Sequence, residues 1–133
     1  MKEITRINHI GIRVANLEVS REFYEKIGFA FIVGPVGPEP VAIMEHPSGV
    51  NINFILNAHA KEKENVLMDI PLKHTGYTHM ALEITDLDSV TAQLKRENIA
   101  ITGGPITLPD GAKFIFVRDP DSNVIEFHKP ASN

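Results

Sequence analysis

The stretch Asn8-His9-Ile10-Gly11-Ile12-Arg13-Val14 returns 70 residues later as Thr78-His79-Met80-Ala81-Leu82-Glu83-Ile84. In both copies the even-numbered positions are apolar, while the odd-numbered ones carry the histidine, small residues and charge. This alternation is typical of a half-buried β-strand. Each histidine is therefore expected to point away from the apolar face of its strand.

The repeat extends well beyond these strands. It continues without a gap from Leu17 and Leu87 to Pro35 and Pro105, and it resumes with three additional residues where 46–54 aligns with 119–127. In that second alignment Asn53 corresponds to Glu126. The chain is therefore predicted to be an internal duplication.

Turn signals and apolar spacing predict the order β-α-β-β-β in each half. The first half is expected to hold strands at 8–14, 29–33, 41–46 and 50–57, a helix from 15 to 27 and a loop at 34–40. The second half is expected to hold strands at 76–84, 99–102, 113–117 and 123–128 and a helix capped by Asp86, with Val90 and Leu94 facing inward.

The first helix is expected to cover the even-numbered face of its strands with Val19, Phe23 and Ile27, and to end at Gly28. The predicted fold class is α+β, with two tandem β-α-β-β-β modules in a single domain, 1–133. Module one spans about 5–57, the connector about 58–74 and module two about 75–130.

Composition limits the classes of function and partner that the chain can have. At 133 residues with 43% hydrophobic residues, the chain is long enough for one compact core. A net charge of −4 with interspersed signs argues against nucleic acid or an anionic membrane as a partner. No apolar run approaches a membrane span or a signal peptide, which favours the cytoplasm. Without cysteine, a metal must be held by histidine, carboxylate, amide or water.

Duplication places four polar residues in two equivalent pairs, His9 with Asn53 and His79 with Glu126. If the modules pack with pseudo-twofold symmetry through their polar faces, these residues converge. Two imidazoles and a carboxylate suit Fe(II), Mn, Ni or Zn and leave positions open for substrate. Taken singly, each histidine is better explained as a structural residue with a backbone partner, and Glu126 as a charge on a strand. The shared repeat position of the two histidines, with Glu126 opposite an amide, favours the metal site.

Neighbouring residues have two interpretations each. Arg13 either binds a substrate anion or is a solvent-exposed strand charge. His128 shares the face of Glu126 and is either a second base or a surface residue. Phe114 and Phe116 either line an apolar wall of the substrate pocket or pack within the sheet.

The sequence also resembles a known superfamily, the vicinal oxygen chelate proteins. This superfamily includes glyoxalase I, extradiol dioxygenases, fosfomycin-resistance thiol transferases, methylmalonyl-CoA epimerase and bleomycin-binding proteins. Essentially the whole chain is covered. The matching segments are His9-Ile10-Gly11-Ile12, Phe23-Tyr24, Ile27-Gly28-Phe29, the stretch 79–84, and the stretch 119–127.

The resemblance implies an incomplete eight-stranded barrel with its helices outside and a divalent metal held by His9, His79 and Glu126. Asn53 is a possible further ligand, at a position where glyoxalase I typically carries glutamate. A neutral amide is a poorer ligand than a carboxylate and cannot act as a base. Ser122 stands where the superfamily usually has glycine.

The expected function is that of a metal-dependent glyoxalase-like lyase or isomerase acting on a small oxygenated substrate. Glu126 either stays a ligand or moves a proton. One alternative is an extradiol-type dioxygenase or thiol transferase using the same triad, and another is a metal-free small-molecule binding protein. A homodimer is expected, because the apolar connector residues 66–68 and 70 must pack against a surface.

Overall fold

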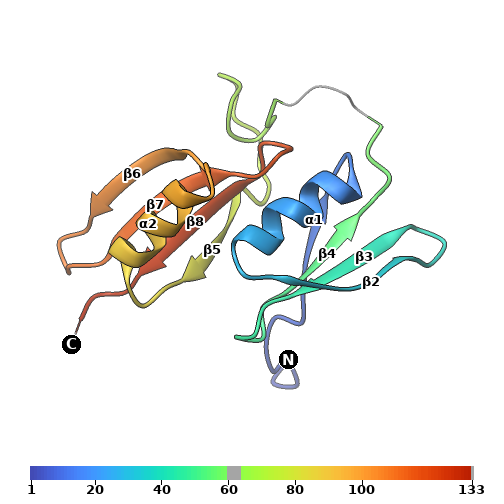
Figure 1. The fold of residues 1–133 in the computed structure, drawn as a ribbon, viewed down its shortest axis with the longest axis horizontal. Helices are drawn as coiled ribbons and strands as arrows, with labels where there is room; N and C mark the ends of the chain where they lie inside the picture. Colours follow the sequence, from blue (N-terminus) through green and yellow to red (C-terminus); the bar gives the residue numbers. More distant parts are fainter. Residues whose placement is uncertain (60–63, 133) are drawn as a thin grey trace. The chain divides into compact units, whose positions relative to one another are not determined.

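A computed structural model describes residues 1–59 and 64–132, and the chain divides into two compact units, Met1–Glu62 and Lys63–Asn133. Each unit holds one β-α-β-β-β module (Figure 1). The first contains β1 (Ile10–Arg13), α1 (Leu17–Lys26), β2 (Ala30–Val36), β3 (Val41–Glu45) and β4 (Asn51–Ile55). The second contains β5 (His79–Glu83), α2 (Leu87–Arg96), β6 (Ile101–Thr107), β7 (Lys113–Arg118) and β8 (Val124–Lys129).

The two sheets have the same topology. The first has the strand order β1-β4-β3-β2 and the second β5-β8-β7-β6, each with one parallel pair, β1 with β4 and β5 with β8. The remaining pairs are antiparallel. The predicted α+β fold of two tandem modules is therefore confirmed, while the single domain and the joining of the two sheets in one incomplete eight-stranded barrel stay predictions.

The core of the first module lies between α1 and one face of its sheet. The even-numbered residues Ala42, Met44, Ile52 and Phe54 of β3 and β4 are all fully buried. Tyr24 of α1 is also fully buried, with its ring centroid 5.2 Å from that of Phe54. The prediction that α1 covers the even-numbered face is thus confirmed.

The residues that α1 buries against the sheet differ from those predicted. Its buried residues are Ser20 and Tyr24, whereas Val19 is 49% exposed. Of the predicted row, Phe23 and Ile27 are half-buried, and only Val19 is exposed. Ser20 was missed because hydrophobic spacing counts serine as polar. A side chain as small as that of Ser20 lets the helix lie close to the sheet, and the Tyr24 ring fills the space one turn later.

The edge strands are longer than predicted. β2 and β6 were expected to end at residues 33 and 102, but both run on through a Gly-Pro pair to Val36 and Thr107. Both are edge strands with irregular register. Pro35 and Pro105 are tolerated there because a proline at a bulged sheet edge removes little from the hydrogen-bond ladder.

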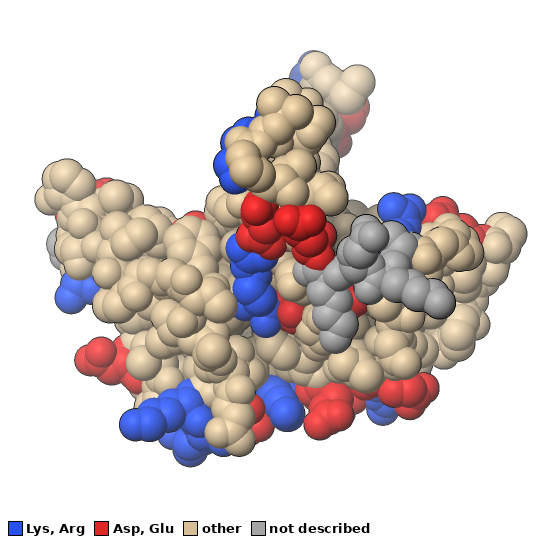
Figure 2. Space-filling view, turned by 90° about the horizontal axis from the view of Figure 1, so that it is seen from above, with Lys and Arg blue, Asp and Glu red and all other residues tan. Residues whose placement is uncertain are grey.

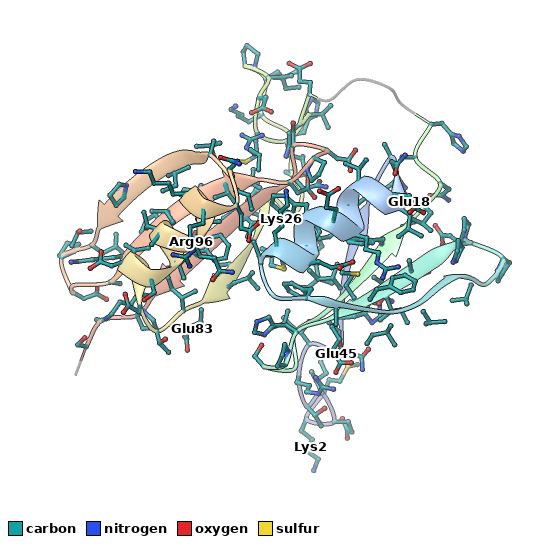
Figure 3. All side chains as sticks on the ribbon, viewed as in Figure 1. Lys2, Glu18, Lys26, Glu45, Glu83 and Arg96 are labelled. Atoms are coloured by element: carbon teal, nitrogen blue, oxygen red, sulfur yellow. The ribbon has the colours of Figure 1, made fainter. Side chains whose placement is uncertain are left out.

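Both helices are stabilised at their ends by capping side chains and by charged residues. The side chains of Asn16 and Asp86 accept hydrogen bonds from backbone N–H groups three residues later, which confirms the predicted cap at Asp86. Glu18 lies in the first turn of α1, and Lys26 and Arg96 lie in the last turns of α1 and α2 (Figure 3). These charges oppose the partial charges at the helix ends.

The connector is attached to the second module by polar contacts. Asp69 receives two hydrogen bonds of 2.9 Å from the guanidinium of Arg118, and the Asn65 amide donates to the carbonyl of Ser122 at 3.1 Å. Val66 is 61% exposed, and the homodimer inferred from the apolar residues of the connector stays a prediction.

The ion pair between Asp69 and Arg118 predicts a pH dependence. The hydrogen bonds from Arg118 are the main cause that lowers the pKa of Asp69 below its ordinary value of 3.8. The pair therefore stabilises the folded protein fully above pH 3.8, and this contribution is lost as the pH falls through the lower folded pKa. Asp69→Asn is expected to lower the urea midpoint at neutral pH, and the difference should shrink in acid. Glu64→Gln, at an exposed residue of the same segment, is the control. An equal decrease of the urea midpoint in both variants would contradict the prediction.

The surface carries both signs of charge, which are interspersed over the face drawn in Figure 2. Among the described residues, the structure contains no helix long and apolar enough to span a membrane.

Candidate functional site

In the second module the predicted site residues lie on the face of the sheet opposite its core. Ile115 and Val117 of β7 pair with Phe127 and Ile125 of β8, and all four are buried on the core side. Because side chains alternate along a strand, the intervening residues occupy the opposite face. These are Phe114, Phe116, Glu126 and His128. His79 and Glu83 of β5 lie on the same face, and Glu83 is the last residue of that strand (Figure 3).

Glu126 lies at the centre of this group. It is only 8% exposed, and each carboxylate oxygen contacts a different imidazole. Oε1 lies 3.1 Å from Nε2 of His79, and Oε2 lies 2.7 Å from Nδ1 of His128. The sequence placed these residues on one face, and the structure shows the side chain of His128 half-buried and in contact with Glu126.

The two phenylalanines connect the histidines. Phe116 lies edge-on to His79 at 5.7 Å between ring centroids, and Phe114 lies nearly parallel to His128 at 5.6 Å. The two phenylalanine rings meet edge-on at 5.6 Å. They therefore form a half-buried aromatic row beside Glu126, and a role in contacting substrate stays a prediction.

In the first module, His9 lies immediately before β1 and is exposed. Its Nδ1 is 2.9 Å from Oδ1 of Asn8, and in the second module Nδ1 of His79 is 2.9 Å from Oγ1 of Thr78. A polar side chain just before each histidine thus holds the same ring nitrogen. Asn8 and Thr78 occupy equivalent places in the repeat, which is the signal in the sequence that could have predicted these contacts.

The register supports the alignment of Asn53 with Glu126. Asn53 pairs with Gly11 of the parallel neighbour β1, and Glu126 pairs with Ala81 of β5, which is the repeat equivalent of Gly11. Asn53 is half-buried on β4. The first module therefore has an amide where the second has a carboxylate.

Arg13 is engaged within its own module. Its Nε donates to Oδ1 of Asn57 at 3.0 Å, and its guanidinium lies 3.9 Å from a carboxylate oxygen of Glu39. Both ends of that ion pair are more than half exposed. A nearby carboxylate partly satisfies Arg13, and its predicted contact with a substrate anion is untested.

The second module brings together two atoms of the kinds that bind divalent cations. Nε2 of His79 lies 3.1 Å from Oε1 of Glu126, and imidazole nitrogen and carboxylate oxygen are both ligands of such cations. With Nδ1 of His79 in contact with Thr78, Nε2 is the ring nitrogen that faces Glu126. Within the part of the chain that the structure describes, no three or more His, Cys, Asp or Glu side chains meet to hold an ion. The ligand set with His9 therefore stays a prediction.

The two modules share one strand topology, with His9 and His79 at equivalent positions and Asn53 equivalent to Glu126. The chain is therefore a protein of two tandem modules that arose by duplication. The chain belongs to the Glyoxalase/Bleomycin resistance protein/Dioxygenase superfamily, whose family model matches residues 6–127. The resemblance stated from the sequence is therefore confirmed.

The individual relatives share only limited sequence identity with this chain. A lactoylglutathione lyase of Neisseria meningitidis is 27% identical over 135 residues, covering 92% of this chain and 88% of the relative. The mitochondrial methylmalonyl-CoA epimerase of Bos taurus is 28% identical over 105 residues, covering 72% of this chain and 56% of the relative. The crystal structure of a glyoxalase/dioxygenase from Nostoc punctiforme has a TM-score of 0.77 at 20% identity, covering 98% of this chain and 94% of that one, and shows the shared fold.

Proposed function

We propose that the protein is a metal-dependent lyase or isomerase of the glyoxalase type, acting on a small oxygenated substrate chelated to Fe, Mn, Ni or Zn. His9, His79 and Glu126 hold the divalent cation, with Asn53 as a possible further ligand. The observation that carries the proposal is the close pair of His79 Nε2 and Glu126 Oε1 on the face of the second sheet opposite its core.

The bound cation would act as a Lewis acid toward a substrate oxygen. A lyase or isomerase of this type also needs a group that holds a proton while it moves between neighbouring substrate atoms. Glu126 is the member of the proposed set suited to this task, because its carboxylate is largely shielded from water and the amide of Asn53 is not a base. Phe114 and Phe116 would provide the apolar wall beside it.

The relatives support this choice among the alternatives. One is named a lactoylglutathione lyase and another an epimerase, whereas neither name denotes a dioxygenase or a thiol transferase. A metal-free binding protein has no need to keep two histidines and a glutamate at the positions that the superfamily uses for its ligands. The cytoplasmic location and the homodimer are part of the same proposal.

Metal analysis of protein purified without chelator is the first test, and about one divalent cation per chain is expected. Turnover of methylglyoxal–thiol adducts and of catechols then separates the reaction classes. Activity on the adducts alone would support a lyase, and ring cleavage of catechols would point to a dioxygenase. Protein that remains metal-free after incubation with each cation would contradict the proposal and favour a binding protein.

A further inference from the structure

His128 contacts the metal-ligand candidate Glu126 from the side away from His79. Its Nδ1 lies 2.7 Å from Oε2 of Glu126, shorter than the 3.1 Å contact between His79 and Oε1. Because an ionised carboxylate only accepts hydrogen bonds, the imidazole of His128 is the donor. Hydrogen bonds to a charged acceptor are stronger and shorter than neutral ones, so this contact is well suited to fix the orientation of the carboxylate.

The ring of His128 is itself held in place. It lies at 7° to the ring of Phe114, with 5.6 Å between centroids, and the two residues are directly paired across β7 and β8. Phe114 in turn packs edge-on against Phe116. Since both partners sit on paired strands, the donor of His128 reaches Glu126 without having to order a flexible side chain.

We propose that His128 is a positioning residue that acts through Glu126. By holding Oε2, it keeps Oε1 beside Nε2 of His79, so that Glu126 binds a divalent cation through one oxygen. Glu126 would then offer the cation Oε1 alone, because Oε2 stays bonded to His128. This inference rests on the proposed function, because it requires a cation at His79 and Glu126.

The test compares two replacements of His128. His128→Phe keeps a ring against Phe114 but removes the donor, whereas the side-chain amide of His128→Asn places a donor close to the position of Nδ1. Titration with Co²⁺ alone, followed by calorimetry, is expected to show about 10- to 100-fold weaker binding in the phenylalanine variant. The asparagine variant should remain closer to wild type. His74→Phe, in the exposed connector, is the matched control and should bind as wild type does.

The visible absorption of bound Co²⁺ provides a second readout, since its intensity falls as the coordination number rises. A carboxylate freed to bind through both oxygens should lower the intensity in His128→Phe and not in His128→Asn. A merely structural histidine would not move this signal. Thermal unfolding of the metal-free variants checks their fold, and His128→Leu replaces the phenylalanine variant if that one does not fold.

The outcomes separate this inference from the proposed function. Wild-type affinity and absorption in His128→Phe, together with lost binding in His79→Ala, would overturn the positioning role and leave the proposed metal site standing. Wild-type affinity in His79→Ala would instead overturn the proposed ligand set. Equal weakening in the phenylalanine and asparagine variants would also contradict the inference, because the asparagine keeps the donor.

Discussion

Replacing His79 with alanine is expected to abolish stoichiometric binding of a divalent cation. The variant removes one proposed ligand, and it also removes the imidazole that lies 3.1 Å from Oε1 of Glu126. Losing only a partner that orients a ligand costs about 10- to 100-fold in affinity, so losing the ligand itself should cost more than about 100-fold.

Calorimetry and thermal unfolding measure this effect together. A cation that binds only the folded protein raises its melting temperature, and a chelator reverses that rise. The rise should be present in wild type and absent in His79→Ala. His74→Ala controls for the loss of a histidine outside the proposed site, and an unchanged metal content in His79→Ala would count decisively against the assignment.

Replacing Asn53 with glutamate is expected to tighten the binding of a divalent cation. The change adds a formal negative charge at the position equivalent to Glu126. A unit charge about 4 Å from a cation is worth several kcal/mol at an effective dielectric constant near 20, and desolvation of the new carboxylate offsets part of this. We therefore expect an affinity gain of about tenfold or more.

The same variant discriminates between reaction classes. A second carboxylate takes up an open position, which a lyase using two glutamates would tolerate and a dioxygenase that must accommodate both substrate and oxygen would not. Calorimetry with turnover of methylglyoxal–thiol adducts and of catechols measures both effects. Gln93→Glu on α2 adds the same charge elsewhere and should leave the affinity unchanged. An affinity of Asn53→Glu equal to that of wild type would mean that Asn53 does not face the cation.

Local patterns in the sequence predicted the elements well where a local interaction forms them. Asn16 and Asp86 cap their helices with their own side chains, and the alternation in β3 and β4 matches their buried faces. The continuation of β2 through Pro35 was missed because it depends on this strand lying at a sheet edge. Ser122 adopts a left-handed backbone with φ of 65°, a conformation that favours the glycine that the resemblance implies at this position.

The sequence by itself determined that the chain is a duplication, that each half folds as β-α-β-β-β, and that Asn53 is the counterpart of Glu126. These features follow from periodicity and spacing, which a single chain records directly. Only the tertiary structure decided that His128 holds Glu126, that Arg13 is engaged by Asn57 and Glu39, and that Asp69 ties the connector to Arg118. The contacts of Arg13 and Asp69 join residues from different strands or loops, and they depend on strand register. The contact of His128 with Glu126 lies within β8 and depends on side-chain rotamers, which sequence spacing does not specify.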